Sequence, residues 1–202
     1  MAREDCRWGV AGSDEADGKI GDAKVDSDNI MTTFWLVRHG QTDWNVQGRW
    51  QGHADPPLNA LGVKQTQILG EGLAHVKFDA IFSSDLDRAY ETACAVGNRQ
   101  GLEVRIEARL REINLGEWEG VTQDEIKRRY PAEWRDRQLN PLEARAPGGE
   151  SVLELAERVI PAAASISRLY PNGLVLLVSH GLALAVLICH AQGLPLEDAF
   201  DS

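Results

Sequence analysis

The chain has 202 residues, of which 43% are hydrophobic and 26% are charged, so its length and composition suit one domain with a substantial core. Its formal net charge of −10 argues against a nucleic-acid-binding surface, which needs a basic face, and an anionic substrate would need a local cluster of arginines. Three cysteines without a CxxC pair indicate neither a disulfide framework nor a zinc site, and no apolar run is long enough to cross a membrane. We therefore expect a cytoplasmic protein that contacts neither nucleic acid nor membranes.

Residues 1–30 differ from the rest of the chain. They are rich in Gly, Asp, Glu, Ala and Ser and show no periodic apolar pattern, so we expect a disordered extension that precedes one domain over residues 31–202. Met31 stands just before the first predicted strand. One hypothesis is that the natural protein starts at Met31, and the mass of the native protein would test it.

Short apolar runs alternate with amphipathic stretches along the rest of the chain. Strands are predicted at residues 34–37, 77–82, 103–106 and 174–178. Helices are predicted from the cap Asn59 to about residue 74, and over 86–99, 123–130, 151–170 and 182–191. The remainder of 107–150 reads as irregular. This alternation predicts a three-layer α/β/α sandwich with a mostly parallel central sheet.

Three of the predicted strands lead into residues that suit one chemistry. The first ends at Arg38 and His39, the second is followed by Arg88 one turn into the next helix, and the last ends at His180. In a parallel sheet these ends share the edge where ligands bind. Arginine presents a planar fork of donors that matches phosphate oxygens, and histidine can attack phosphorus. The pattern favours a phosphate monoester, with arginine and histidine in place of Mg²⁺ as the source of positive charge.

A leaving alkoxide also needs a proton, which a nearby carboxyl group can supply. The stretch after the third strand offers Glu112, Glu117 and Glu119, and composition alone does not choose among them. The alternative interpretation of Glu112 is a loop carboxylate paired with Arg111.

Four ordered motifs resemble those of the histidine phosphatase superfamily, and most closely its phosphoglycerate-mutase-like phosphatases. The resemblance covers about residues 33–198. The motifs are Arg38-His39-Gly40-Gln41-Thr42-x-x-Asn45, Ser83-Ser84-Asp85-Leu86-x-Arg88-Ala89-x-x-Thr92-Ala93, Leu110-Arg111-Glu112 with Gly116-x-Trp118-Glu119-Gly120, and Ser179-His180-Gly181.

The resemblance implies a role for each catalytic candidate. It implies that His39 is phosphorylated, that Arg38, Arg88 and His180 form the phosphate pocket, and that Glu112 is the proton donor. No metal ion or other cofactor is implied. The substrate-binding residues that follow from it are Arg38, Asn45, Gln51, Gly52, Arg88, His180 and Gly181.

The mutases of this family commonly read Gly-Glu-Ser after the nucleophile and carry an insert, whereas this chain reads Gly40-Gln41-Thr42. The resemblance therefore favours a metal-independent phosphatase that hydrolyses small phosphorylated metabolites through a phosphohistidine. A phosphoglycerate mutase is one alternative. An inactive relative that binds phosphorylated ligands without turnover is the other.

Residues 122–147 are expected to cover the site. Their basic residues predict either recognition of a second anionic group, such as a carboxylate, or a solvated helix face. These residues are Lys127, Arg128, Arg129, Arg135, Arg137 and Arg145. The histidines that match no functional position, for which we expect surface or packing roles, are His53, His75 and His190.

Relatives continue with a further strand beyond the position of Asp198, whereas this sequence ends at Ser202. Two alternatives follow: either the sequence is truncated, or the sheet lacks a C-terminal edge strand, and a missing edge would expose apolar surface and unpaired backbone groups. Such an edge favours strand exchange. The expected partner is a small phosphorylated metabolite, and the formation of a homodimer is left open.

Overall fold

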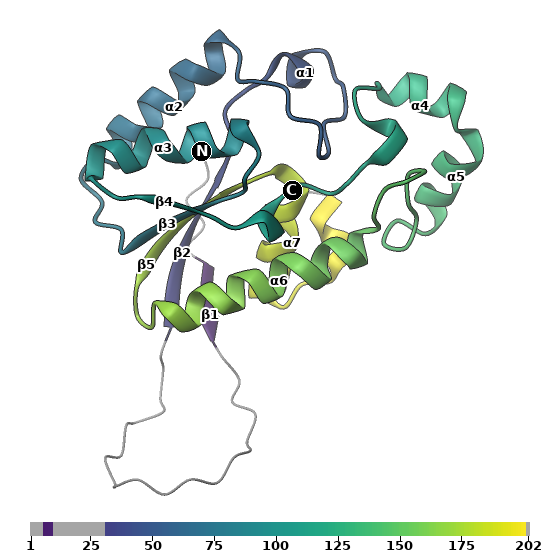
Figure 1. Cartoon of the computed structure of the whole chain (residues 1–202). Helices are drawn as coiled ribbons and strands as arrows, with labels where there is room; N and C mark the ends of the chain where they lie inside the picture. Colours follow the sequence, from purple (N-terminus) through teal and green to yellow (C-terminus); the bar gives the residue numbers. More distant parts are fainter. Residues whose placement is uncertain (1–5, 10–30, 201–202) are drawn as a thin grey trace, which may run out of the picture.

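The computed structural model describes residues 6–9 and 31–200 and places a sheet between two layers of helices (Figure 1). The strand order is β1-β2-β5-β3-β4. Strand β1 pairs antiparallel with β2, and the other neighbours are parallel, which confirms the predicted sandwich with a mostly parallel sheet. The strands are β1 (Cys6–Gly9), β2 (Met31–Arg38), β3 (Ala80–Ser83), β4 (Val104–Ile106) and β5 (Leu174–Ser179).

Helices cover both faces of the sheet. Helices α2 and α3 lie on one face and α6 and α7 on the other, while α4 and α5 stand to one side beyond the ends of the strands (Figure 1). The helices are α1 (Asp43–Val46), α2 (Ala60–Leu73), α3 (Asp87–Gln100), α4 (Gln123–Arg129), α5 (Pro131–Leu139), α6 (Val152–Leu169) and α7 (Gly181–Gln192), with 3-10 turns η1 (Ala108–Leu110), η2 (Gly116–Trp118) and η3 (Leu196–Phe200).

The central position of β5, which is covered on both faces, explains why its sequence is apolar throughout. Val175 and Leu177 belong to the core cluster beneath α6 and α7, whereas Leu176 and Val178 belong to the cluster beneath α2 and α3. Successive side chains of a strand point to opposite faces, so a strand that is covered on both sides needs an apolar residue at every position.

Local sequence signals set the helix boundaries as predicted. The Asn59 side chain accepts a hydrogen bond from the backbone N–H of Gly62 and caps α2, and Ser151 forms a capping box with Glu154 at the start of α6. Helix α5 lies within the stretch that was expected to be irregular, because Pro131 follows the predicted helix over 123–130 and can end it. Pro131 also occupies the first turn of α5, where its missing N–H has no cost.

The edge of the sheet beside β2 is only partly covered. Within the expected disordered extension the structure describes one strand, β1, at residues 6–9; residues 1–5 and 10–30 lie outside the described part of the chain. Strand β1 pairs with residues 31–34. In the part of the chain that the structure describes, no strand follows β5.

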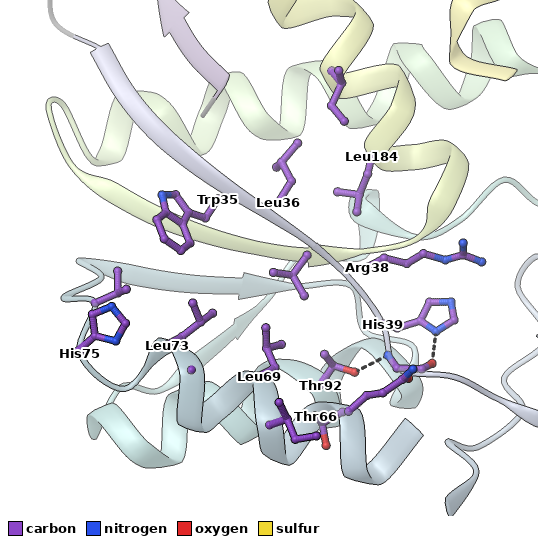
Figure 2. A pocket seen from close by; sticks show the side chains of 17 residues that line it. Trp35, Leu36, Arg38, His39, Thr66, Leu69, Leu73, His75, Thr92 and Leu184 are labelled. Carbon is purple, nitrogen blue, oxygen red and sulfur yellow. Dashed lines mark hydrogen bonds between the residues drawn. The ribbon is translucent and has the colours of Figure 1, made fainter. Parts of the chain in front are cut away.

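An apolar groove of about 810 Å³ lies beside this edge, between α2 and α7 (Figure 2). Trp35, Leu69, Leu73 and Leu184 are among its lining residues, and Arg38 and His39 lie at one end of it (Figure 2). Among the described residues, no helix is both long and apolar enough to cross a membrane.

The close approach of α2 to the loop after β2 generates a prediction. A Cβ atom at Gly62 would lie 2.1 Å from the backbone oxygen of Gln41, whereas nothing lies within 4 Å of a Cβ at Gly72 in the same helix. Gly62→Ala should therefore lower the free energy of unfolding by about 1–3 kcal/mol through overpacking. Gly72→Ala is the matched control and should raise it by about 0.5–1 kcal/mol, because alanine favours a helix. Urea unfolding measures both, and equal effects would contradict the contact.

Candidate active site

The register of the sheet brings the predicted strand ends together. Arg38 of β2 is paired with Ser179 of β5, and the backbone N–H of His39 donates to the carbonyl of Ser179 at 3.1 Å. The residue after each strand therefore emerges at the same place. As a result, the rings of His39 and His180 lie with their centroids 5.2 Å apart.

The imidazole of His39 is held in one tautomer. Its Nδ1 lies 2.7 Å from the carbonyl oxygen of Gly40, and because a carbonyl can only accept, Nδ1 carries the proton and Nε2 keeps its lone pair (Figure 2). The pKa of His39 is lowered from 6.5 to about 3. Burial is the largest cause and the positive charges of Arg88 and Arg38 act in the same direction, whereas the hydrogen bond to Gly40 raises the pKa. His39 is therefore neutral near pH 7, the form in which Nε2 is a nucleophile.

His180 is fully buried beside it. Its Nε2 lies 2.9 Å from the hydroxyl of Ser84, which accepts the N–H of Leu86 and can donate its own proton to Nε2. That arrangement leaves the proton of His180 on Nδ1, which is buried and has no hydrogen-bond partner among the described residues. Burial, with the charges of Arg88 and His39, lowers the pKa of His180 well below its usual range.

Arg88 presents a buried, oriented cation. Its guanidinium donates to the backbone carbonyls of Ala54 and Gly52 at 2.7 and 2.9 Å and to the Asp55 carboxylate at 3.2 Å. Its Nε has no partner among the described residues. Burial lowers the pKa of Arg88, and the charge of Asp55 opposes that shift. Gly52 has φ +55 and a Cβ there would lie 2.4 Å from Glu119, so this turn requires glycine.

Glu112 is fixed at the N-terminus of α7. One carboxylate oxygen accepts the backbone N–H groups of Ile113 and Ala183 at 2.9 and 3.2 Å, and the other accepts that of Leu182 at 3.1 Å. The suggested pair with Arg111 is wrong, because Arg111 forms a bidentate ion pair with Asp85 (2.7 and 2.5 Å).

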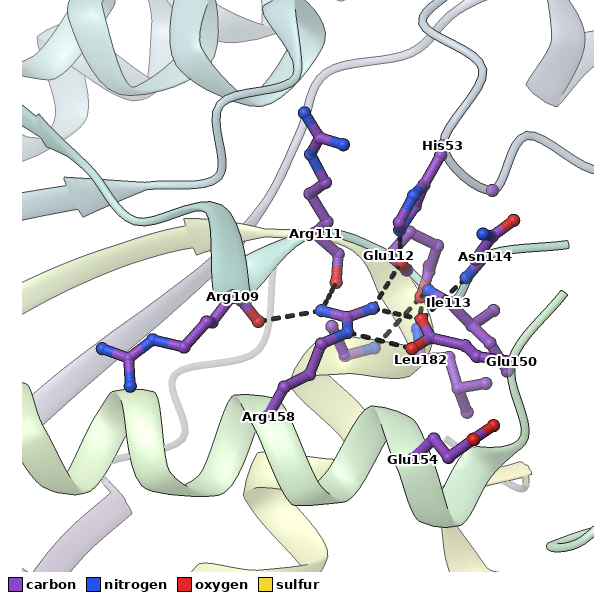
Figure 3. Close-up of polar contacts among 12 residues, drawn as sticks. His53, Arg109, Arg111, Glu112, Ile113, Asn114, Glu150, Glu154, Arg158 and Leu182 are labelled. Atoms are coloured by element: carbon purple, nitrogen blue, oxygen red, sulfur yellow. Dashed lines mark hydrogen bonds and ion pairs between the residues drawn. The ribbon is translucent and has the colours of Figure 1, made fainter.

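A partly buried arginine that sequence reasoning missed holds the loop of Glu112 in place. Arg158 of α6 donates to the backbone carbonyls of Arg109, Arg111 and Glu112 at 2.7–2.8 Å and pairs with Glu150 (Figure 3). Arg158 stands 46 positions after Glu112 in the chain, and no local pattern in the sequence marks it.

His53 acts on the same loop. Its Nε2 donates to the carbonyl of Glu112 at 2.9 Å (Figure 3), so this histidine, expected to have only a surface or packing role, supports the loop of the candidate acid. Burial, with the nearby charge of Arg158, lowers the pKa of His53. The side chains of Glu117 and Glu119 are engaged elsewhere, with the Tyr130 hydroxyl at 3.0 Å and the backbone N–H of His53 at 2.7 Å.

The charged residues surround a cavity of about 230 Å³. Of the predicted site residues, His180 and Gly181 are not in its lining; His180 lies buried beside His39, and a Cβ at Gly181 would lie 3.6 Å from the Arg38 guanidinium carbon. The lining comprises Arg38, His39, Asn45, Arg49, Trp50, Gln51, Gly52, Arg88, Glu112, Ile113, Leu115, Arg137 and Leu182. Because this cavity is charged and the larger groove is apolar, we assign the chemistry to the cavity.

Comparison with known proteins identifies the family. Residues 34–202 match the model of the Histidine phosphatase superfamily (branch 1). The chain belongs to this superfamily. A curated relative, "Probable phosphoglycerate mutase GpmB" of Salmonella choleraesuis, is 39% identical over 166 residues, which cover 82% of this chain and 77% of the relative.

Solved structures of the superfamily have the same fold. Bacillus stearothermophilus YhfR has a TM-score of 0.79 at 36% identity, with 85% of each chain covered. The alpha-ribazole phosphatase of Shigella flexneri has a TM-score of 0.78 at 33% identity, with 83% of each chain covered. A mycobacterial glucosyl-3-phosphoglycerate phosphatase has a TM-score of 0.73 at 38% identity, covering 81% of this chain and 82% of its own. The chain is a phosphomonoesterase of the histidine phosphatase superfamily.

The buried neutral imidazole of His39 generates a pH prediction. Folded His39 stays neutral down to about pH 3, whereas the unfolded chain takes up a proton on it below pH 6.5. The unfolded state therefore binds more protons in that window, and the free energy of unfolding falls as the pH decreases through it. Between pH 6.5 and 5 the wild type should lose about 1.5–2 kcal/mol more than His39→Gln. Urea unfolding across this range measures the difference, and parallel curves would contradict a neutral His39.

Proposed function

We propose that the protein is a metal-independent phosphatase that hydrolyses small phosphorylated metabolites through a phosphohistidine on His39. The observation that carries the proposal is the state of His39, a buried, neutral imidazole whose Nε2 keeps its lone pair and whose pKa is lowered by burial and by the charges of Arg88 and Arg38. The phosphatases among the structural relatives support the reaction class. The size of the cavity, about 230 Å³, supports a small substrate.

In the first step His39 Nε2 attacks phosphorus, an N–P bond forms and the P–O bond to the leaving group breaks. Arg38, the unpaired Nε of Arg88 and the unpaired Nδ1 of His180 stabilise the phosphoryl oxygens. Glu112 delivers its proton to the leaving oxygen, which departs as an alcohol. Asn45, Gln51 and the backbone around Gly52 orient the ester, since they line the same cavity.

In the second step water attacks the phosphohistidine. The N–P bond breaks, Glu112 takes a proton from the attacking water, and inorganic phosphate leaves while His39 regains its lone pair. Each group thus returns to its starting protonation state. Arg158 and His53 contribute as positioning residues, because they hold the backbone that carries Glu112.

Turnover of p-nitrophenyl phosphate in EDTA tests the proposed nucleophile. The wild type should be active without added metal, and His39→Ala should lose at least about a thousandfold in kcat, as expected for loss of a nucleophile. His75→Ala is the matched control, because it removes an exposed imidazole outside the charged cavity. Undiminished turnover in His39→Ala would refute the nucleophile. An inactive wild type would instead favour the alternative that the protein binds phosphorylated ligands without turnover.

The role of Glu112 is tested with two leaving groups. Glu112→Gln should lower kcat/KM for an alkyl phosphate by about a hundredfold or more, and that for p-nitrophenyl phosphate much less, because nitrophenolate leaves without a proton. Glu117→Gln, a change of the same size on an exposed neighbour, should affect neither. Equal losses for both esters in Glu112→Gln would remove Glu112 as the acid.

The curated relative named as a probable phosphoglycerate mutase makes mutase activity the second candidate. A mutase must keep water from the phosphohistidine, whereas a phosphatase must admit it. Incubation with 3-phosphoglycerate separates the two, since a phosphatase releases inorganic phosphate and a mutase yields 2-phosphoglycerate.

A further inference from the structure

Arg137 is a cationic side chain in the cavity that the proposed reaction does not use. It belongs to α5, the helix at the mouth of the site, and lines the same cavity as His39 and Glu112. Trp134 sits three positions earlier, on the same face of the helix, and packs against Trp50 and Trp118 with ring centroids 6.1 and 6.2 Å apart. This contact fixes α5 and directs Arg137 toward the cavity.

Aromatic rings hold the guanidinium of Arg137 in place. Its Cζ lies 5.0 Å from the ring centroid of Trp50 and 5.4 Å from that of Phe200, distances typical of cation–π contacts. Such contacts engage the flat face of the guanidinium and leave its N–H edges available. Among the described residues, no carboxylate pairs with Arg137 and no group accepts a hydrogen bond from it.

The other arginines of the cavity differ in this respect. Arg88 pairs with Asp55 at 3.2 Å, and Arg49 donates to the Gly120 carbonyl at 2.6 Å and lies 3.7 Å from Glu125. Arg38, which also lacks an ion pair among the described residues, adjoins His39 in the chain and is assigned to the phosphoryl group. Burial lowers the pKa of Arg137, and no nearby acid opposes this shift as Asp55 does for Arg88. Arg137 is therefore the charge that remains after the phosphoryl group has been matched.

We propose that Arg137 binds a carboxylate on the leaving-group part of the substrate, so that the preferred substrates are small phosphomonoesters with a second anionic group. The assignment rests on the proposed binding of the phosphoryl group at His39. A carboxylate fits because its two oxygens match the free edge of a guanidinium. It is also a small group, as a cavity of about 230 Å³ requires of a ligand that reaches from His39 to Arg137.

Two esters with the same skeleton provide the test. 3-Phosphoglycerate and glycerol 3-phosphate differ in a carboxylate against a hydroxymethyl group. Their dissociation constants are measured by calorimetry on the full chain carrying His39→Gln, which cannot form the N–P bond. Adding Arg137→Gln should reduce the preference for 3-phosphoglycerate by about tenfold to a hundredfold, the range for loss of a charge-assisted hydrogen bond. Adding Arg137→Lys, which keeps the charge without the fork, should retain part of the preference.

Arg135→Gln is the matched control, because it removes the same charge from an exposed position of the same helix and should leave the preference within twofold of its starting value. The preference is a ratio within one protein, so a general loss of stability does not alter it. An unchanged ratio in Arg137→Gln, or an equal change in Arg135→Gln, would overturn the assignment. Failure of the wild type to hydrolyse p-nitrophenyl phosphate would overturn the proposed phosphatase function without deciding the role of Arg137, which the binding ratio decides separately.

Discussion

The parallel pairing of β2 with β5 is the constraint on which the site depends. It aligns Arg38 with Ser179, so the backbone of His39 bonds to the end of β5 and the ring of His180 lies beside that of His39. A slip of one residue would turn every side chain of β2 to the other face of the sheet. The apolar residues of β5, buried on both faces, prevent such a slip. The core of the sheet thus fixes the geometry of the proposed nucleophile.

A second constraint comes from the opposite side of the cavity, where there is no strand to position the candidate acid. The segment around Glu112 is irregular, and its backbone carbonyls would be costly to bury without donors. Arg158 supplies donors for three of them, and His53 adds a second donor to the carbonyl of Glu112 (Figure 3). A helix on one face of the sheet and a loop beyond its edge therefore hold the same stretch of backbone. The side chain of Glu112 then needs only the N-terminus of α7 to be oriented.

The sequence allowed a mostly parallel sheet and the clustering of His39, Arg88 and His180 to be anticipated, because strand ends and helix caps are local signals that a parallel topology brings to one edge. It did not allow Arg158 or Arg137 to be singled out. Both act through contacts between segments far apart in the chain, Arg158 with the loop of Glu112 and Arg137 with Trp50. No periodicity distinguishes them from the solvated arginines of the same helices. Helix α5 was missed for a local reason, since a proline can end one helix and begin the next.

The candidate site contains buried polar groups that lower the stability of the folded chain. Arg88 Nε and His180 Nδ1 are buried donors without a partner in the described residues, and each such atom costs about 1–3 kcal/mol relative to a paired one. Burial lowers the pKa of both imidazoles, and the positive charges of Arg88 and Arg38 add to this effect, so both rings stay neutral near pH 7. A phosphoryl group brings acceptor oxygens and negative charge together, and so satisfies both needs at once. The features that weaken this region of the folded chain are thus the ones that select an anion, and binding energy can be directed to the charge that develops in the transition state.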